Sequence, residues 1–196
     1  MELKNLIDRC KLGEKEAFRE LFQGIEKEAL ATAYLISGNR GISEDILQET
    51  YIKCIREIKN LRNEGAFKTW FFKIMIRTGW DLCNKHSRIV PVDIENQRQV
   101  HLHGFQYEDD IANCELKLTV HNAINKLNDK LKAVVILYYF NDMSVEEVAK
   151  ILGCFKTTVK SRLFYARNQL KEELQHSFSD DYNFKKINGR ECDHGV

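Results

Sequence analysis

Apolar residues recur every three or four positions along the first ninety residues, which is the spacing of one face of an α-helix. One such stripe covers residues 3–10 and stops near Gly13, and a second runs continuously from 17 to 36. A third runs from Ser43 to Leu61, where Ser43 suits the N-cap and acidic residues follow in the first turn. An aromatic-rich stripe over residues 67–86 predicts a further helix.

The periodicity fails between Ser87 and about Asp110, a stretch that contains the only proline of the chain. Helical spacing returns at Ile111 and continues in a further helix after Asn128 and Asp129. These patterns predict an all-α fold of two small helical domains. The predicted division is a first domain over residues 1–88, an acidic flexible linker over 89–112, a second domain over 113–176 and a disordered tail over 177–196.

The stretch from Ser144 to Lys171 predicts a helix-turn-helix. Ser144 and Glu147 have the spacing of a capping box, and Gly153 suits the C-cap of the same helix. The helix that follows carries five basic residues and no acidic one up to Lys171. A basic second helix in such a pair is expected to enter a DNA major groove. A basic solvated face on a helical bundle is the plainer alternative.

Packing of the two helices of this motif leaves several side chains of the second helix exposed. They are Lys156, Lys160, Ser161, Phe164, Tyr165 and Arg167. Cations in this set can contact phosphates, serine and lysine can reach base edges, and an aromatic ring can contact a thymine methyl group. The composition of the helix therefore favours binding to duplex DNA.

The charge of the chain is segregated rather than large. The 196 residues include 30 basic and 29 acidic ones, so the net charge is only +1. Residues 56–88 hold eight basic residues against three acidic ones, whereas residues 92–115 hold six acidic residues against one basic residue. Affinity for DNA must therefore come from local basic surfaces and not from the total charge.

Two further motifs lie in the first domain. Asp45 and Glu49 are four residues apart with Gln48 beside them, and like charges at this spacing mildly destabilise a helix. Such an acidic ridge suits a basic partner, although an ordinary exposed polar face is the alternative. Over residues 67–88, basic side chains alternate with aromatic ones, and only part of these rings is expected in the core. Single-stranded nucleic acid is bound by this combination.

Several kinds of chemistry have no sequence signature in the chain. The six cysteines form no C-x-x-C pair, which indicates reduced thiols in the cytoplasm and no metal site. No apolar run has the length of a membrane span. No glycine-rich phosphate loop, nucleophile motif or metalloprotease motif is present, so we expect neither an enzyme nor a cofactor.

Taken in order, these motifs resemble those of a bacterial sigma factor of the sigma-70 family, in its extracytoplasmic-function group. The resemblance covers residues 12–174 and rests on five segments: Ala17 to Phe22, the run EDILQE from Glu44 to Glu49, Phe67 to Ile74, Ser144 to Gly153, and Thr158 to Leu170. Each segment alone is modest, but their order and spacing are specific. The resemblance implies a non-enzymatic initiation factor that binds core RNA polymerase and recognises the −10 and −35 promoter elements.

The resemblance also implies roles for individual residues. Core polymerase would be bound by Asp45, Gln48, Glu49 and Ile52. The unwound single strand of the −10 element would be bound, and melting assisted, by Phe67, Lys68, Trp70, Lys73, Arg77, Lys85 and Arg88. The duplex −35 element would be bound by Lys156, Thr158, Lys160, Ser161, Arg162, Phe164, Tyr165 and Arg167. The acidic linker would extend toward the polymerase active-site channel.

A few positions depart from the pattern of this family. Arg77 stands where many relatives have asparagine, Phe155 where a capping serine is frequent, and Tyr165 where arginine is frequent. Thr157 replaces a frequent glycine, so we expect the recognition helix to start a residue or two later with Thr157 as its cap. The promoter sequence of better-known relatives therefore does not transfer to this chain.

The resemblance further implies an anti-sigma partner, often membrane-bound in this family, which would hold a cytoplasmic factor near the membrane. Two alternatives explain less of the sequence. A helix-turn-helix regulator that never joins polymerase gives the acidic ridge and residues 67–88 no role. If the chain were a helical adaptor or anti-factor, its basic helices would be solvated surfaces without a role in DNA binding. Such a protein would show no salt-dependent DNA binding.

Overall fold

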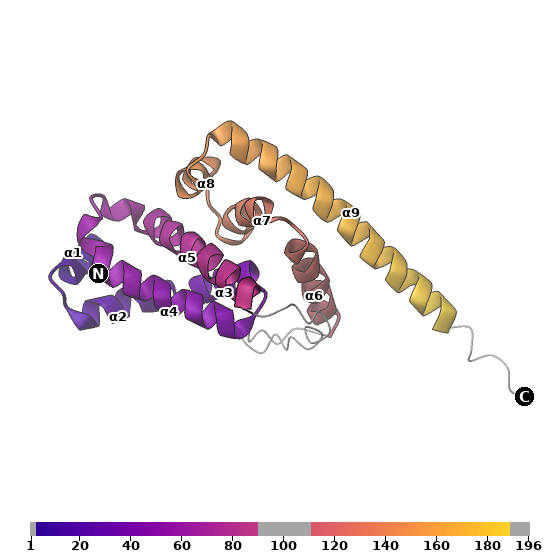
Figure 1. Cartoon of the computed structure of the whole chain (residues 1–196), viewed down its shortest axis with the longest axis horizontal. Helices are drawn as coiled ribbons and strands as arrows, with labels where there is room; N and C mark the ends of the chain where they lie inside the picture. Colours follow the sequence, from indigo (N-terminus) through magenta and orange to yellow (C-terminus); the bar gives the residue numbers. More distant parts are fainter. Residues whose placement is uncertain (1–2, 90–110, 189–196) are drawn as a thin grey trace, which may run out of the picture.

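Every element in the described part of the chain is helical. The structure is a computed structural model that describes residues 3–89 and 111–188, and neither range contains a strand. We refer to residues 3–89 as the first domain and to residues 111–188 as the second domain (Figure 1). The predicted all-α fold is confirmed.

The first domain consists of five α-helices and two short 3-10 turns. They are α1 (Leu3–Lys11), α2 (Lys15–Gln23), α3 (Glu26–Ser37), α4 (Arg40–Glu57), η1 (Ile58–Asn60), η2 (Glu64–Ala66) and α5 (Phe67–Ile89). Helices α3, α4 and α5 pack against one another and carry most of the contacts within this domain.

Aromatic side chains fill the core of the first domain. Phe71 and Phe72 of α5 are fully buried, and Phe22 of α2 stacks on Tyr51 of α4 with ring centroids 4.2 Å apart. Burial of each such ring contributes roughly 1.5–3 kcal/mol relative to exposure. Where α5 crosses α3, Gly79 permits close approach, because a methyl group there would lie 3.0 Å from a side-chain carbon of Ile36.

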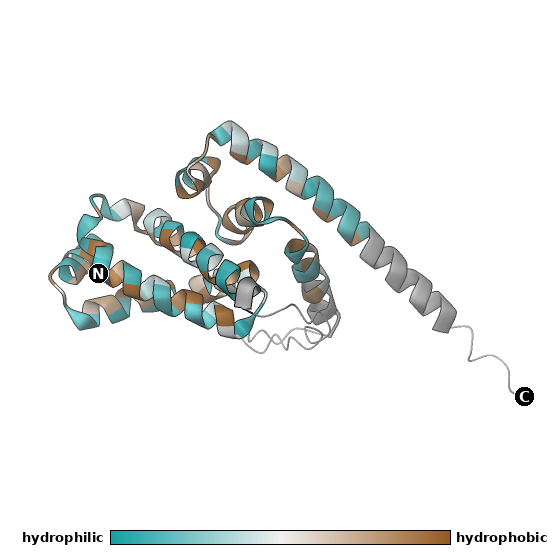
Figure 2. Cartoon of the chain, viewed as in Figure 1, coloured by the Kyte–Doolittle hydropathy of each residue, from teal (hydrophilic) through white to brown (hydrophobic). Residues whose placement is uncertain are grey.

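The second domain begins with α6 (Ile111–Asn125) and α7 (Asp129–Val135), and a π-helical turn, η4 (Ile136–Phe140), follows directly. Asn128 caps α7 by accepting a hydrogen bond from the backbone N–H of Leu131. Helices α8 (Val145–Leu152) and α9 (Lys156–Asn188) then form the predicted helix-turn-helix. Figure 2 shows hydrophobic and hydrophilic residues on different sides of these helices, as expected for helices that bury one face.

The turn signals at both ends of α8 are confirmed. The Ser144 hydroxyl accepts a hydrogen bond from the backbone N–H of Glu147, and the Glu147 carboxylate accepts one from the backbone N–H of Ser144. Gly153 adopts a left-handed conformation with φ of 63°, and its N–H donates to the carbonyl of Ala149. A residue with a side chain would be strained at this φ, which is why glycine ends the helix.

The predicted start of α4 at Ser43 is wrong. The helix begins at Arg40, and the side chain of Asn39 caps it by accepting a hydrogen bond from the N–H of Ile42. Ser43 is buried inside the first turn, where its hydroxyl donates to the carbonyl of Arg40. Asparagine and serine are comparable N-caps, so the choice between them depended on which residue the core buries.

Three other boundaries also differ from the prediction. The stripe over residues 17–36 is divided into α2 and α3 by a break at Gly24 and Ile25. Helix α9 starts at Lys156, so Thr157 lies within the helix and does not cap it. The tail predicted to be disordered from 177 is helical as far as Asn188, because neither glycine nor proline interrupts the sequence there.

The predicted linker lies mostly outside the described residues. Residue 89 belongs to α5 and residues 111 and 112 belong to α6, so both ends of the predicted linker are helical. The two domains nevertheless contact each other directly, since α3 touches α6, α7 and η4, and α5 touches α8. Val134, Leu137 and Val148 of the second domain belong to the same apolar cluster as the core of the first domain.

The capping box at the start of α8 generates a prediction about stability and its pH dependence. Ser144→Ala removes the acceptor for the N–H of Glu147 and should lower the free energy of unfolding by about 1 kcal/mol. Hydrogen bonding, chiefly from the Ser144 side chain, lowers the pKa of the Glu147 carboxyl. The ionised carboxylate therefore stabilises the fold at neutral pH, and this contribution is lost as the pH falls through the lowered pKa.

Urea unfolding at neutral and at acidic pH measures both effects. The difference between Ser144→Ala and the natural chain should shrink at acidic pH. Ser161→Ala is the control, because that hydroxyl donates to the carbonyl of Thr157 within a helix and caps nothing. Equal losses of stability in the two variants would contradict the capping role of Ser144.

Candidate functional site

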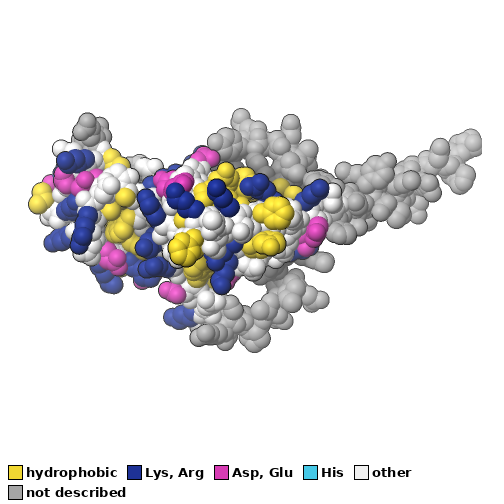
Figure 3. All heavy atoms as spheres, turned by 90° about the horizontal axis from the view of Figure 1, so that it is seen from above, with side chains coloured by type: hydrophobic (Ala, Val, Ile, Leu, Met, Phe, Trp, Pro, Cys, Tyr) yellow, Lys and Arg dark blue, Asp and Glu magenta, His cyan; other side chains and the backbone are white. Residues whose placement is uncertain are grey.

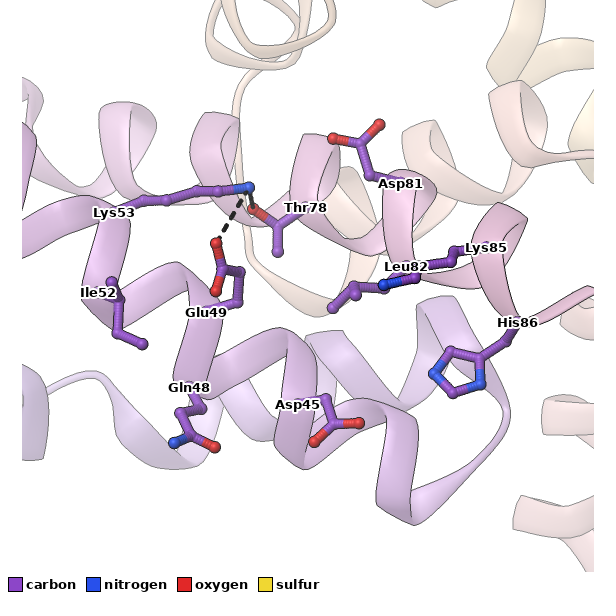
Figure 4. Close-up of a pocket in the computed structure, with 10 residues that line it drawn as sticks. All are labelled: Asp45, Gln48, Glu49, Ile52, Lys53, Thr78, Asp81, Leu82, Lys85 and His86. Atoms are coloured by element: carbon purple, nitrogen blue, oxygen red, sulfur yellow. Dashed lines mark hydrogen bonds and ion pairs between the residues drawn. The ribbon is translucent and has the colours of Figure 1, made fainter. Parts of the chain in front are cut away.

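A groove between α4 and α5 contains the predicted acidic ridge. Asp45, Gln48, Glu49 and Ile52 form its α4 wall, and α5 contributes the opposite wall (Figure 4). The groove has a volume of about 750 Å³ and is open to solvent. Its remaining lining residues are Lys53, Thr78, Asp81, Leu82, Lys85 and His86.

The helical repeat of α4 explains why these residues lie on the surface. Ile46, Leu47 and Thr50 point into the core, so the positions between them face outward. Asp45 and Gln48 are exposed. Ile52 is half-buried at the edge of the groove.

Lys53 connects the two walls of the groove. Its Nζ atom donates to the hydroxyl of Thr78 at 3.0 Å and lies 3.8 Å from a carboxylate oxygen of Glu49. The Thr78 side chain comes from α5, so this contact ties α4 to α5 across the groove (Figure 4). Gln48 points away from α5 in the same view. The groove thus offers exposed acidic groups on α4 opposite Lys85 and His86 on α5.

The predicted residues for single-stranded DNA are distributed unevenly along α5. Lys68, Arg77 and Lys85 are exposed, and Lys73 and Trp70 are partly buried. Phe67 is only 4% exposed and packs on Trp70 and Phe71, with ring centroids 6.1 and 5.9 Å away. The side chain of Arg88 lies outside the described residues.

As expected, part of these rings lies in the core, and this part includes Phe67 and Phe72 besides Phe71. Their burial leaves Trp70 as the ring among the predicted residues of α5 that is partly accessible. Lys68 is also not free, because it forms an ion pair with Glu28 of α3 at 2.8 Å.

The start of α9 presents a mixed basic and aromatic face. Val159, Leu163 and Ala166 are buried against the rest of the second domain, which turns the other positions outward. Lys160, Ser161, Phe164, Tyr165 and Arg167 are all exposed. Figure 3 shows apolar side chains among Lys and Arg on this face of the molecule, over α8 and the start of α9.

The other predicted residues of α9 are engaged within the protein. Lys156 is exposed but forms an ion pair with Glu146 of α8. Arg162 is partly buried, and its guanidinium donates to the sulfur of Cys154 at 3.8 Å. Thr158 is also partly buried. The contact from Arg162 links α9 to the turn before it.

Phe155 is a surface residue that sequence reasoning noted only as a departure from the family. Its side chain is 82% exposed in the turn between α8 and α9. Phe164 and Tyr165 are 60% and 63% exposed, and their rings meet edge to face with centroids 5.7 Å apart. Three exposed rings in the turn and at the start of α9 are more apolar surface than a single exposed side chain would give, and such surface is typical of interaction sites. In the sequence, position 155 falls between the buried stripe of α8 and the buried stripe of α9. This placement was the signal that its side chain would be exposed.

Two cysteine thiols of the first domain are buried in its core. Burial raises the pKa of the Cys54 thiol to about 12 and that of Cys10 to about 11, so both stay protonated at neutral pH. No group of three or more metal-ligating side chains is found among the described residues. Within the same residues, no helix is long and apolar enough to span a bilayer.

Comparison with known families assigns both domains. Residues 21–89 match the family model of sigma-70 region 2, and residues 117–170 match that of sigma-70 region 4. The first match contains the groove and α5, and the second contains the helix-turn-helix. The two matches therefore cover both of the surfaces described above.

Individual relatives cover nearly the whole chain. The ECF RNA polymerase sigma-E factor of Haemophilus influenzae is 31% identical over 87% of this chain and 94% of its own length. The ECF RNA polymerase sigma factor SigW of Bacillus subtilis is 28% identical over 89% of this chain and 98% of its own length.

A solved structure has the same arrangement of helices. The sigma factor RpoE of Bartonella quintana, solved with the anti-sigma factor NepR, superposes with a TM-score of 0.67 at 25% identity. That superposition covers 81% of this chain and 96% of the other. Together with the family matches, these relationships establish the class of protein. The chain belongs to the extracytoplasmic-function group of the sigma-70 family and is a non-enzymatic sigma factor that directs RNA polymerase to promoters.

Proposed function

We propose that the two exposed surfaces divide the work of promoter recognition, with the α4 ridge binding core polymerase and the α9 face reading the −35 element. The observation that carries this proposal is the outer face of α9. The buried stripe of α9 is wholly apolar. Five other side chains of the helix are exposed together, namely Lys160, Ser161, Phe164, Tyr165 and Arg167. Side chains that can contact phosphates, base edges and thymine methyls thus share one helix face.

The acidic ridge of Asp45, Gln48 and Glu49, with Ile52 at its edge, binds the coiled-coil clamp of the largest polymerase subunit in this proposal. Exposed carboxylates beside a half-buried apolar side chain suit a basic helical partner. No shielding element covers Asp45 or Gln48 within the described residues. Family membership supports the assignment, because the run from Glu44 to Glu49 is the segment that resembles the core-binding motif.

The −10 element is bound by basic and aromatic side chains of α5. Lys68, Lys73, Arg77, Lys85 and Arg88 contact the backbone of the unwound strand, and the partly accessible Trp70 stacks on a base. The buried ring of Phe67 supports Trp70, since the two rings are in tilted contact with centroids 6.1 Å apart. Capture of unstacked bases favours strand separation.

We also propose an anti-sigma factor as a regulatory partner. Its support is the Bartonella quintana sigma factor, which was solved with the anti-sigma factor NepR and covers most of this chain. Promoter DNA and polymerase place the active factor in the cytoplasm at the nucleoid, and a membrane-bound anti-sigma factor would hold the inactive form near the membrane. The regulator that never joins polymerase is disfavoured, because residues 21–89 match sigma-70 region 2.

Run-off transcription with bacterial core polymerase tests the proposal as a whole. Promoter fragments from the host genome are transcribed with and without the protein, and dependent transcripts should share an upstream pair of elements. Tight binding of the protein alone to duplex DNA, without new transcripts, would contradict a division of recognition between two surfaces.

Reversal of the ridge charges should abolish polymerase binding. In Asp45→Lys with Glu49→Lys, repulsion from a basic clamp should weaken affinity for core polymerase by at least about 100-fold. Glu16→Lys with Glu20→Lys is the matched control, because it reverses two exposed acids at the same spacing on α2. Native gel assembly with labelled protein measures both, and circular dichroism confirms that each variant folds. Equal assembly by the two double variants would refute the role of the ridge.

Loss of one phosphate contact should weaken −35 binding without changing its sequence preference. Lys160→Ala should reduce affinity to a similar degree for good and poor −35 sequences. The slope of log affinity against log salt concentration should fall in magnitude by about one. Holoenzyme binding to promoter fragments over a salt series provides the measurement. Lys15→Ala, an exposed lysine of α2, should leave the slope unchanged.

Aromatic contacts of α9 should make binding sensitive to thymine methyl groups. In the promoter found by run-off transcription, deoxyuridine replaces each −35 thymine in turn. Loss of a contacted methyl should weaken holoenzyme binding about fourfold, from about 0.8 kcal/mol per buried carbon group. The Phe164→Ala or Tyr165→Ala protein should no longer distinguish thymine from deoxyuridine at the contacted position. Undiminished discrimination in both variants would show that these rings do not read the base.

A further inference from the structure

An ion pair joins the two helices of the helix-turn-helix at the start of α9. Glu146 lies in the first turn of α8, and Lys156 is the first residue of α9. The Lys156 Nζ atom donates a hydrogen bond to a carboxylate oxygen of Glu146 at 2.5 Å. The Glu146 side chain is 51% exposed and the Lys156 side chain is 59% exposed, so a large ligand can reach the pair from solvent.

The surroundings of the Glu146 carboxyl favour its charged form. Its pKa is lowered, chiefly by the hydrogen bond from the Lys156 side chain, and further by a backbone hydrogen bond and by the charge of Lys156. A smaller contribution comes from the charge of Lys160, one turn further along α9. At neutral pH, one negative charge therefore lies beside two cations of the surface that we assign to duplex DNA.

Lys156 differs from the other exposed cations at the start of α9. Lys160 and Arg167 are exposed, and neither forms an ion pair within the described residues. In a helix-turn-helix, the N-terminal residues of the second helix are the ones that contact the DNA bases. A cation placed at the end of the helix that approaches DNA thus has an acidic partner of its own.

Pairing of Lys156 with an acid changes how strongly α9 attracts a phosphate. Protein cations bind DNA by releasing its condensed counterions, and each phosphate contact adds to the salt dependence of binding. A lysine that is paired with a carboxylate must exchange that carboxylate for the phosphate, and the carboxylate left beside the phosphate then repels it. The surface of α9 therefore binds DNA as if it carried one cation fewer.

We propose that Glu146 is a determinant of DNA affinity, which competes with the phosphate backbone for Lys156 and so weakens binding to duplex DNA of any sequence. This inference rests on the proposed function, because it takes the α9 face as the surface that binds the −35 element. It adds an acidic residue of α8 to a site that otherwise consists of residues of α9. The competition takes place between two surface side chains and requires no movement of the backbone.

Weaker attraction to phosphate has its largest consequence on DNA that contains no promoter. Non-specific binding comes almost entirely from phosphate contacts, whereas a specific complex also has contacts to the bases. When one phosphate contact is weakened, a non-specific complex has no other source of affinity, while a specific complex keeps its base contacts. Glu146 thus reduces the time that the chain spends on unrelated sequences.

The plainer role of Glu146 is to stabilise α8. Acidic side chains in the first turn of a helix interact favourably with the helix dipole, and Glu147 lies in the same turn. This role predicts that a neutral substitute slightly lowers stability and leaves DNA binding unchanged. Competition for Lys156 predicts instead that removal of the charge strengthens DNA binding, which damage to the fold would not do.

Glu146→Gln tests the competition in the full-length protein, because it removes the charge and keeps the size of the side chain. Glu172→Gln is the matched control, since it removes the same charge from an exposed residue of α9 that forms no ion pair within the described residues. Fluorescence anisotropy with a labelled non-promoter duplex, over about 50 to 200 mM salt, gives the slope of log affinity against log salt concentration.

The two variants should differ in this slope. If Glu146→Gln adds one phosphate contact, its slope should steepen by about 0.9, so its affinity should fall about 3.5-fold further over this salt range than that of the natural chain. At the low-salt end, Glu146→Gln should bind more tightly than the natural chain. Glu172→Gln should keep the slope of the natural chain.

The double variant Glu146→Gln with Lys156→Ala shows whether the gain in affinity passes through Lys156. Without the lysine amine there is no cation for Glu146 to release, so the gain should be lost when Glu146→Gln is made in the Lys156→Ala protein. A gain of equal size with and without Lys156 would show that the carboxylate repels DNA directly, and would overturn the competition. Circular dichroism and urea unfolding confirm that each variant is folded.

Lys160→Ala in the same assay separates this inference from the proposed function. If Lys160→Ala lowers the slope while Glu146→Gln and Glu172→Gln give equal slopes, the competition is refuted and the DNA-binding role of α9 stands. If binding of the natural chain does not depend on salt and Lys160→Ala changes nothing, the proposed −35 surface fails and the competition fails with it. A steeper slope for Glu146→Gln than for Glu172→Gln, together with a lower slope for Lys160→Ala, supports both.

Discussion

Helix α5 packs in the core of the first domain, forms one wall of the groove and contacts the second domain. The arrangement of the rest of the molecule depends on these three contacts of one helix. Phe71 and Phe72 on its inner face are fully buried in the core of the first domain. Near its end, Lys85 forms part of the groove wall opposite α4. Near its start, Lys68 contacts Asn141 of the second domain. Successive residues of a helix point in different directions. One rigid helix, held by its buried face, can therefore position both the groove wall and the contact with the second domain without any loop.

The small net charge is consistent with this division of surfaces. A net charge of +1 gives little overall attraction to DNA, so binding depends on where the charges are placed. The acidic groups of the ridge lie on α4, whereas the exposed cations of the helix-turn-helix lie on α9. Separation of opposite charges onto two domains agrees with the proposed function, in which one surface binds a basic protein and the other a polyanion.

Local features were predictable from the sequence, and contacts between distant segments were not. The capping box at Ser144 and the left-handed Gly153 depend on a few neighbouring residues, and both are confirmed. The start of α4 was misplaced, because burial of Ser43 is decided by packing and not by capping preference. Phe67 was assigned to DNA for a similar reason, since an aromatic ring beside cations carries no sign of whether the core buries it.

The hydrogen bond between Asn141 and Glu28 illustrates the limit of sequence reasoning most clearly. Asn141 and Glu28 are 113 residues apart, and neither belongs to a motif. Their contact depends on a π-helical turn and a left-handed aspartate, which hydrophobic periodicity does not indicate. The acidic ridge and the −35 face, by contrast, were predicted as surfaces because each lies on a single helix with a regular buried stripe.

The contact between the two domains leaves the acidic ridge of α4 accessible. Helix α4 packs on α3 and α5 of its own domain, and Asp45 and Gln48 stay exposed while the domains are docked. In the proposed function, core polymerase can therefore contact the ridge without any rearrangement of the first domain. The main contacts between the domains come from α3 and α5, so a change of charge in the α4 ridge should act on the partner of the ridge and leave the packing of the two domains in place.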